Sequence, residues 1–148
     1  MQNQVPNIVL AEDDEDDSFF FEEALKSVAP NPSFIRAKDG VELTELLKEL
    51  PFLPDLVFLD LNMPRKNGAQ CLSEIRNQQE LQHLPVVVLS TSSSESIIDE
   101  MYHYGANLYV QKPNDVRSWK RVIAKVLNLD WNIQTPFSFK KNFMLIDF

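Results

Sequence analysis

Five short runs of β-branched and aliphatic residues recur along the chain, and each predicts a β-strand. The runs span residues 8–11, 34–37, 56–59, 86–89 and 108–110. Three of them are apolar almost throughout instead of alternating with polar residues, which is typical of strands covered on both faces. The pattern therefore predicts a buried sheet of parallel strands.

Helical patterns separate these strands. Apolar side chains recur at helical spacing in five sets: Phe20, Ala24, Leu25 and Val28; Val41, Leu43, Leu46, Leu47 and Leu50; Cys71, Leu72 and Ile75; Ile97, Ile98, Met101 and Tyr102; Trp119, Val122, Ile123, Val126 and Leu127. Regular alternation of strand and helix predicts the α/β class, a doubly wound five-stranded parallel sheet with helices on both faces. We expect this domain to span residues 6–129.

The periodic pattern ends after Asp130. Residues 130–148 form a C-terminal extension in which five aromatic residues stand among polar ones: Trp131, Phe137, Phe139, Phe143 and Phe148. Such an extension either docks on the domain or forms a contact surface, and the sequence favours neither.

Composition narrows the function classes. The 148 residues suffice for one domain with a sizeable core, and a formal charge of -8 repels phosphate backbones. No apolar stretch approaches the roughly 20 residues that span a bilayer, and the polar start lacks a signal peptide's apolar segment. The only cysteine, Cys71, cannot form an internal disulfide. We therefore expect a cytoplasmic protein with no membrane contact and no direct nucleic-acid binding.

Polar residues follow the predicted strands at their carboxyl ends, where ligands bind in this fold class. Glu12 and Asp13 follow the first strand, Asp60 the third, Ser90 the fourth and Lys112 the fifth. Carboxylates held close together repel one another unless a cation neutralises them, so this edge implies a divalent metal. Oxygen ligands without histidine or cysteine point to Mg²⁺. Beside it an ionised aspartate can attack phosphorus while lysine and hydroxyl groups take up charge.

The acidic residues 14–17 have a simpler interpretation. Acidic side chains are favoured near helix N-termini, so this run is typical of a solvated helix start.

Over residues 6–129 the chain resembles the receiver domains of two-component response regulators. The resemblance rests on the acidic pair at 12–13, the segment at 58–64 with Gly68, and the residues Ser90, Tyr109, Lys112 and Pro113. The segments at 88–92 and 104–107 are most similar to the small stand-alone regulators associated with phytochrome-type histidine kinases. The fold implied is the flavodoxin-like (β/α)5 receiver fold.

The resemblance implies a role for each acidic-site residue. Asp60 would accept a phosphoryl group from a phosphohistidine, and Asp13 and Asp60 would ligate Mg²⁺. Glu12 would act on the metal through water, and Asn62 would supply a backbone carbonyl. Lys112 would pair with the carboxylate or the phosphoryl group.

The resemblance also implies a switch. Ser90 matches the hydroxyl that moves to the phosphoryl group, Tyr109 matches the aromatic residue that swings inward, and Pro113 matches a position that is commonly a cis peptide. Without the surrounding motif, Ser90 would be read as a cap and Tyr109 as packing. Thr91 is larger than the residue many receivers have there, so we hypothesise slow dephosphorylation.

The resemblance further implies a signalling protein that is not an enzyme in the usual sense. Its partners would be a histidine kinase, phytochrome-like or otherwise, or a phosphotransfer protein, and the extension is a candidate homodimer contact. Kinase pairing in the family usually depends on helix one and the loop after strand five, here including Phe19, Phe20, Phe21 and Asn114.

Three other functions could account for parts of this pattern. A phosphatase of the haloacid dehalogenase type needs a second aspartate where this chain has Asn62. A nucleotide-binding module needs a glycine-rich loop, and the chain has only 3 glycines. The remaining alternative is a receiver-like interaction scaffold that is never phosphorylated.

Overall fold

The five predicted strands are confirmed in the computed structural model, which describes residues 6–29, 31–129, 131 and 144–145. They are β1 (Asn7–Ala11), β2 (Ser33–Ala37), β3 (Leu56–Asp60), β4 (Val86–Ser90) and β5 (Leu108–Gln111). All pairs are parallel, in the order β2-β1-β3-β4-β5. Every residue of β3 and β4 is buried, and the apolar runs at 56–59 and 86–89 predict this for all but the last residue of each strand. The order places the carboxyl ends of β1 and β3 side by side.

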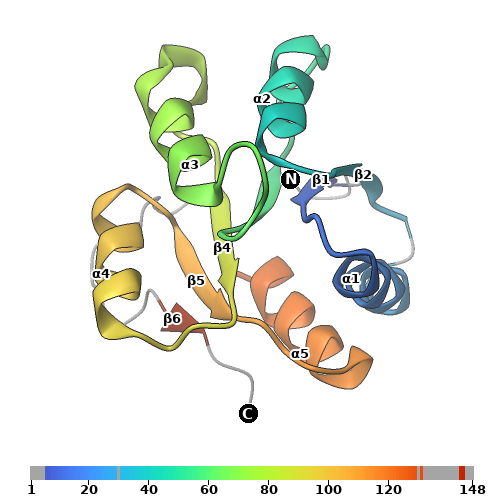
Figure 1. The fold of residues 1–148 in the computed structure, drawn as a ribbon. Helices are drawn as coiled ribbons and strands as arrows, with labels where there is room; N and C mark the ends of the chain where they lie inside the picture. The colour runs from blue at the N-terminus through green and yellow to red at the C-terminus, as the bar shows by residue number, and fades with distance from the viewer. Residues whose placement is uncertain (1–5, 30, 130, 132–143, 146–148) are drawn as a thin grey trace.

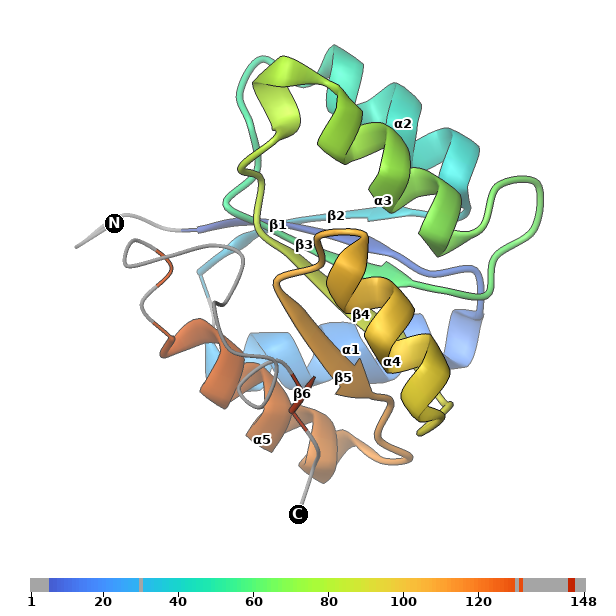
Figure 2. The same ribbon diagram turned by 90° about the vertical axis from the view of Figure 1, so that its left-hand side faces the viewer.

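Among the described residues, five α-helices and a short 3-10 helix accompany the strands. They are α1 (Glu15–Val28), α2 (Gly40–Glu49), α3 (Gly68–Asn77), η1 (Gln79–Leu81), α4 (Glu95–His103) and α5 (Val116–Leu127). Helices α1 and α5 pack on one face of the sheet and α2, α3 and α4 on the other, which gives two separate apolar cores (Figures 1 and 2). The predicted doubly wound α/β class is therefore confirmed.

Four helices begin at a residue whose side chain caps the first turn. These residues are Asp14, Asp39, Asn67 and Asp115, and each side chain accepts a hydrogen bond from a backbone N–H three residues later. Such caps satisfy amide groups that have no partner within the helix. Because Asp14 is three residues beyond β1, α1 starts directly beside the carboxyl edge of the sheet.

One residue of the predicted kinase contact, Phe21 on α1, is buried instead of exposed. Phe21 is only 1% exposed and packs edge-on against Phe58 and Trp119, whose ring centroids lie 4.8 and 5.4 Å away. Phe19 is exposed and Phe20 is half-buried. Three consecutive residues of a helix point in three directions, 100° apart, so only one of them faces the core. Phe21 is thus a core residue and not part of a docking surface.

The C-terminal extension contributes a sixth strand that the apolar pattern did not predict. Strand β6 (Met144–Leu145) pairs in parallel with β5 through the partners Tyr109↔Met144 and Val110↔Leu145. Trp131 packs against the core beneath α5 and donates a hydrogen bond from Nε1 to the Val126 carbonyl. The described parts of the extension are therefore docked on the domain. Phe137, Phe139, Phe143 and Phe148 lie outside the described residues.

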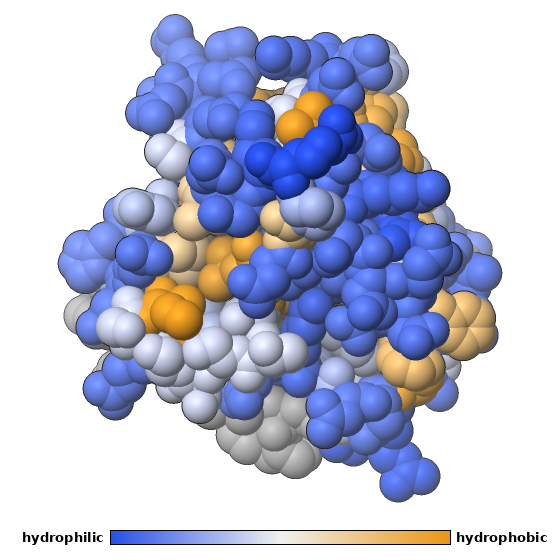
Figure 3. All heavy atoms as spheres, viewed as in Figure 1, coloured by the Kyte–Doolittle hydropathy of each residue, from blue (hydrophilic) through white to orange (hydrophobic). Residues whose placement is uncertain are grey.

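The surface of the domain is largely polar. Figure 3 shows a mainly hydrophilic face with separate hydrophobic areas. Within the part of the chain that the structure describes, no helix has the length and apolar composition needed to cross a bilayer.

Candidate phosphoacceptor and metal site

Three carboxylates meet at the carboxyl edge of the sheet. Asp60 is the last residue of β3, and Glu12 and Asp13 follow directly after β1, which is the strand paired with β3. One oxygen from each of the three side chains lies within 4.8 Å of the others. Glu12 and Asp60 are 1% and 2% exposed, whereas Asp13 is exposed. The structure thus brings together the carboxylates on which the predicted metal site depends.

The backbone around the acidic pair is fixed by the neighbouring edge strand. The Glu12 amide donates to the Ala37 carbonyl at 3.0 Å, and Nε of Arg36 donates to the Glu12 carbonyl at 3.0 Å. The Asp14 amide donates to Oε2 of the Glu12 side chain at 3.2 Å. These bonds hold the Glu12 side chain at the end of β1, directed toward Asp60.

Gly68 allows helix α3 to begin against the end of β3. A Cβ atom at this position would lie 2.5 Å from the Asp60 carbonyl oxygen and 2.8 Å from Cα of Leu61. The Gly68 amide donates to the Leu61 carbonyl at 3.0 Å. The loop between β3 and α3 therefore closes tightly behind Asp60, and a side chain at position 68 would force it apart.

Lys112 supplies a cation to this cluster from the loop after β5. Its ammonium lies 2.8 Å from Glu12 Oε1, 3.1 Å from Asp17 Oδ2 and 3.3 Å from Asp60 Oδ1. The Lys112 amide donates to the Ser90 carbonyl at 2.8 Å, which fixes the backbone from which the side chain reaches inward. The side chain is 9% exposed, so the contacts are shielded from solvent.

Burial sets the charge behaviour of the cluster. It raises the pKa of Glu12 to about 8, although the hydrogen bond from Lys112 opposes it, and the negative charge of Asp60 raises it further. Burial likewise raises the pKa of Asp60 above its ordinary value against the charge of Lys112. For Lys112, burial alone would lower the pKa, but Glu12, Asp60 and Asp17 outweigh it and the pKa lies above its usual value. Two buried carboxylates share one ammonium.

The donor set fits a divalent cation that prefers oxygen. Its three carboxylates lie close enough to surround one ion, and a bound cation would offset the burial that raises the pKa values of Glu12 and Asp60. Asp13 is open to solvent, which leaves room for the waters that Mg²⁺ keeps. The side chain of Asn62 is exposed, and the backbone N–H of Asn62 donates to Asp60 Oδ1 at 3.4 Å.

The predicted switch residues lie beside this cluster on β4 and β5. Ser90 is 2% exposed, and its hydroxyl oxygen accepts a hydrogen bond from the Ser92 amide at 3.1 Å. Tyr109 is fully buried and its hydroxyl donates to the Ser92 carbonyl at 2.7 Å. Both residues therefore contact the loop between β4 and α4, and Tyr109 is turned inward. Thr91 is exposed at the start of that loop.

Pro113 follows Lys112 and is half-buried. The cis peptide expected at this position stays a prediction.

Asp17 belongs to this cluster, although the sequence pattern predicts that it lies in a solvated helix start. It lies one helical turn before the buried Phe21, on the same side of α1. The usable signal was this i, i+4 spacing, which directs Asp17 toward the sheet while its acidic neighbours point outward. The two histidines stay away from the site: His83 is exposed before Pro85, and His103 ends α4.

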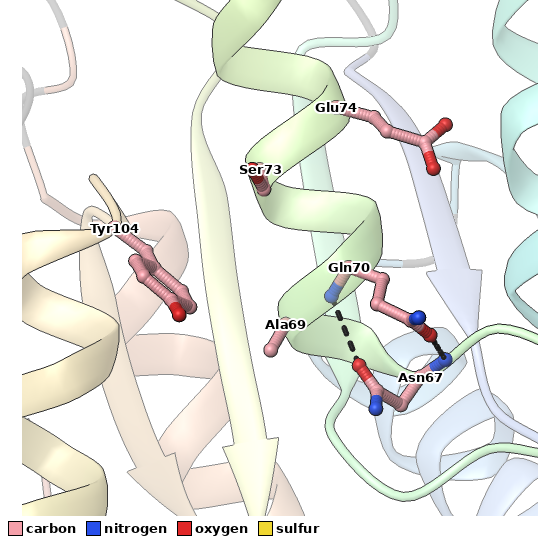
Figure 4. Close-up of a pocket in the computed structure, with 6 residues that line it drawn as sticks. All are labelled: Asn67, Ala69, Gln70, Ser73, Glu74 and Tyr104. Atoms are coloured by element: carbon pink, nitrogen blue, oxygen red, sulfur yellow. Dashed lines mark hydrogen bonds between the residues drawn. The ribbon is translucent and has the colours of Figure 1, made fainter.

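A second surface feature lies away from the acidic cluster. A hollow of about 400 Å³ separates the first turns of α3 from the end of α4. Figure 4 shows Tyr104 facing α3 across it, beside the reciprocal hydrogen bonds of Asn67 and Gln70 that cap this helix. None of the residues lining the hollow belongs to the carboxylate and lysine cluster, so it is not part of that site.

Comparison with known proteins places this geometry in context. Residues 8–124 match the response regulator receiver domain family. The chain is 32% identical to the response regulator Rcp1 of Synechocystis sp. over 124 residues, which cover 80% of this chain and 84% of Rcp1.

Two solved structures are similar in fold and sequence. The Mn²⁺-bound form of Rcp1 matches with a TM-score of 0.73 and 30% identity, covering 82% of this chain and 91% of that chain. The phosphorylated cyanobacterial phytochrome response regulator RcpA matches with a TM-score of 0.77 and 31% identity, over 83% and 91% of the two chains. The predicted resemblance to phytochrome-associated regulators is confirmed.

Proposed function

The chain belongs to the response regulator receiver domain family, and on this premise we propose that it signals through phosphorylation of Asp60. The observation that carries the proposal is the placement of this buried carboxylate within 3.3 Å of the Lys112 ammonium and beside Glu12 and Asp13. A buried nucleophile, a cation and further carboxylates are the groups that phosphoryl transfer to aspartate requires.

The acidic cluster would hold Mg²⁺. Asp13 and Asp60 would ligate it through their carboxylates, Glu12 would act through water, and Asn62 would contribute its backbone carbonyl. Bound there, the ion would neutralise charge on the carboxylates and on phosphoryl oxygens. The Mn²⁺-bound form of Rcp1 supports a divalent ion in a related receiver.

The chain's own residues account for the rest of the reaction. A carboxylate oxygen of Asp60 forms a bond to phosphorus while the bond from phosphorus to the donor's imidazole nitrogen breaks. Lys112 pairs with the negative charge of the phosphoryl oxygens, and the Ser90 hydroxyl, released from the Ser92 amide, donates a hydrogen bond to one of them. Neither histidine of the chain, His83 or His103, lies at the site, so the phosphohistidine that donates the group would belong to another protein.

Phosphorylation would bias the surface formed by α4, β5 and α5. Tyr109 is turned inward and donates to the Ser92 carbonyl, and the Ser92 amide donates to the Ser90 hydroxyl, so a movement of Ser90 would reach Tyr109 through Ser92. Such a local change in charge can shift an equilibrium between two surface states. Thr91 is exposed and follows Ser90 directly, and we infer that it slows attack by water, so that the phosphorylated form is lost slowly.

The partner class follows from the family. The phosphoryl donor would be a histidine kinase or a phosphotransfer protein, with a phytochrome-like kinase favoured by the similarity to RcpA. Phe19, 59% exposed on α1, the half-buried Phe20 and the exposed Asn114 after β5 are the residues of the expected kinase contact that reach the surface. The extension at 130–148 stays a candidate homodimer contact. A scaffold that is never phosphorylated is the alternative function.

Intact-mass measurement after incubation with a small phosphodonor and Mg²⁺ tests the proposal. We expect one phosphoryl adduct on the wild type, and none on Asp60→Asn or in the presence of a chelator. No adduct under any condition, including with a matched histidine kinase, would favour the scaffold.

A further inference from the structure

Lys112 has a third carboxylate partner, Asp17, which the proposed phosphoacceptor and metal roles do not use. Asp17 lies in the first turn of α1, where its amide is held by the side chain of the capping residue Asp14 at 2.9 Å. Its Oδ2 atom is 3.1 Å from the Lys112 ammonium. The helix cap thus fixes the position from which Asp17 reaches the lysine.

The three partners of Lys112 differ in their access to water. The side chains of Glu12 and Asp60 are 2% and 3% exposed, whereas that of Asp17 is 32% exposed. A buried carboxylate that loses its cation cannot be compensated by solvent, but a partly exposed carboxylate can. The contact with Asp17 is therefore the one that Lys112 gives up at the lowest cost.

One ammonium serves three carboxylates, so its partners compete. An ammonium has three N–H donors, and in Lys112 three carboxylates already lie within 3.3 Å of it. A phosphoryl group on Asp60 would replace the single carboxylate charge with about two negative charges farther out from the strand end. Lys112 must then turn toward the phosphoryl oxygens, and Asp17 draws it the other way.

We propose that Asp17 is a positioning residue for Lys112, sharing its ammonium with Asp60 and thereby limiting how strongly the lysine acts on the phosphoacceptor. This inference rests on the proposed function. Loss of the Asp17 carboxylate has two opposite consequences. Lys112 competes harder with a metal ion for Glu12 and Asp60, and it is freer to bind a phosphoryl group.

The test measures binding of Mg²⁺ alone and of beryllium fluoride, a phosphoryl analogue, at saturating Mg²⁺. Both affinities can be measured by isothermal titration calorimetry at about 0.15 M salt. Under this condition, exposed charges separated by more than about 8 Å interact little, so long-range effects of the substitutions are small. The variants are Asp17→Asn and Asp17→Ala. The control is Asp16→Asn, which removes the same charge from an exposed position one residue away.

We expect Asp17→Asn and Asp17→Ala to bind the analogue about two- to fivefold more tightly and Mg²⁺ alone about two- to fivefold more weakly than wild type, the range of a partly exposed ion pair. Asp16→Asn should change neither. If Asp17 had a merely structural role, its loss would weaken binding of both the analogue and Mg²⁺. A change of both affinities in the same direction would therefore overturn the proposal. So would an effect of Asp16→Asn as large as that of Asp17→Asn.

The wild type separates this inference from the proposed function. If the wild type takes up a phosphoryl group and binds the analogue while the Asp17 and Asp16 variants behave alike, only the role of Asp17 is wrong. If the wild type neither binds the analogue nor takes up a phosphoryl group, both proposals are wrong.

Discussion

The ammonium of Lys112 lies 3.3 Å from Asp60 and 2.8 Å from Glu12, two residues at the carboxyl ends of the neighbouring strands β3 and β1. All three side chains are at most 9% exposed, so solvent screens them little. The lysine offsets part of the repulsion between two buried carboxylates and occupies a position where it competes with a divalent ion for both. Its removal should therefore affect metal binding and phosphoryl uptake in opposite directions.

Lys112→Met should bind Mg²⁺ more tightly than wild type, because the competing cation is gone. Phosphoryl uptake should fall about 10²-fold, because the charge on the transferring oxygens loses its partner. Calorimetric titration and the rate of adduct formation by mass spectrometry measure the two effects. Lys112→Arg, which keeps the charge, is the control and should retain weaker Mg²⁺ binding than Lys112→Met. Unchanged Mg²⁺ affinity in Lys112→Met would contradict the competition.

The metal-free protein should become less stable as the pH rises from about 4.5 to about 8. Burial raises the pKa of Glu12 to about 8 from the ordinary 4.5, so between these values the folded state holds a proton that the unfolded state has released. The free energy of unfolding then falls with rising pH.

Urea denaturation in the presence of a chelator measures this slope, which Glu12→Gln should flatten because glutamine does not titrate. Glu15→Gln, exposed in α1, should leave the slope unchanged. A slope that persists in Glu12→Gln would assign the pH dependence to other groups.

Tyr109→Phe should lower the free energy of unfolding by about 1 kcal/mol. The substitution removes the hydroxyl that donates to the Ser92 carbonyl at 2.7 Å, while the buried ring stays in place. Chemical denaturation measures the change, with Tyr104→Phe, 44% exposed, as a control expected to lie within about 0.5 kcal/mol of wild type. An equal effect of both substitutions would show that the buried hydroxyl bond is not what stabilises the loop.

Thr91→Ala should shorten the lifetime of the phosphorylated protein. Alanine blocks less of the approach of water to the phosphoryl group than the exposed Thr91 side chain next to Ser90 does, so hydrolysis of the aspartyl phosphate should accelerate severalfold. The decay of the adduct after removal of the phosphodonor gives the lifetime, and Ser93→Ala in the same loop is the control. A phosphorylated form that is short-lived in the wild type and decays no faster in Thr91→Ala would refute the inference.

The sheet could be predicted because its signals are local. Strands β3 and β4 are apolar up to their last residues, Asp60 and Ser90, and such a sequence is typical of a strand buried on both faces. The placement of Glu12, Asp60 and Lys112 followed from the same pattern, since parallel strands bring their carboxyl ends to one edge.

The contacts that sequence reasoning missed depend on tertiary geometry. Asp17 stands in a run of acidic residues, and only the exact phase of α1 separates it from its solvated neighbours. Strand β6 has two residues, which is too short to show a periodic pattern. A strand this short has no local signature.

Arg76 is a further example, because nothing in its sequence context marks it as internal. Its guanidinium donates to the carbonyls of Gly105, Leu81 and Leu84 and to the side chain of Asn107. Burial lowers its pKa to about 10. The arginine joins α3 to the loops that precede β4 and β5, and these partners come together only in the folded chain.

The most direct test of the central claim is chemical localisation of the phosphoryl group. The protein is phosphorylated with a small phosphodonor and Mg²⁺ and reduced with borohydride, which converts an aspartyl phosphate to homoserine, and the digest is sequenced by tandem mass spectrometry. We expect homoserine at position 60 alone, and none when Mg²⁺ is withheld. Homoserine at Asp13 or another acidic residue, or a phosphoryl group retained on His83 or His103, would contradict the assignment of Asp60 as the phosphoacceptor.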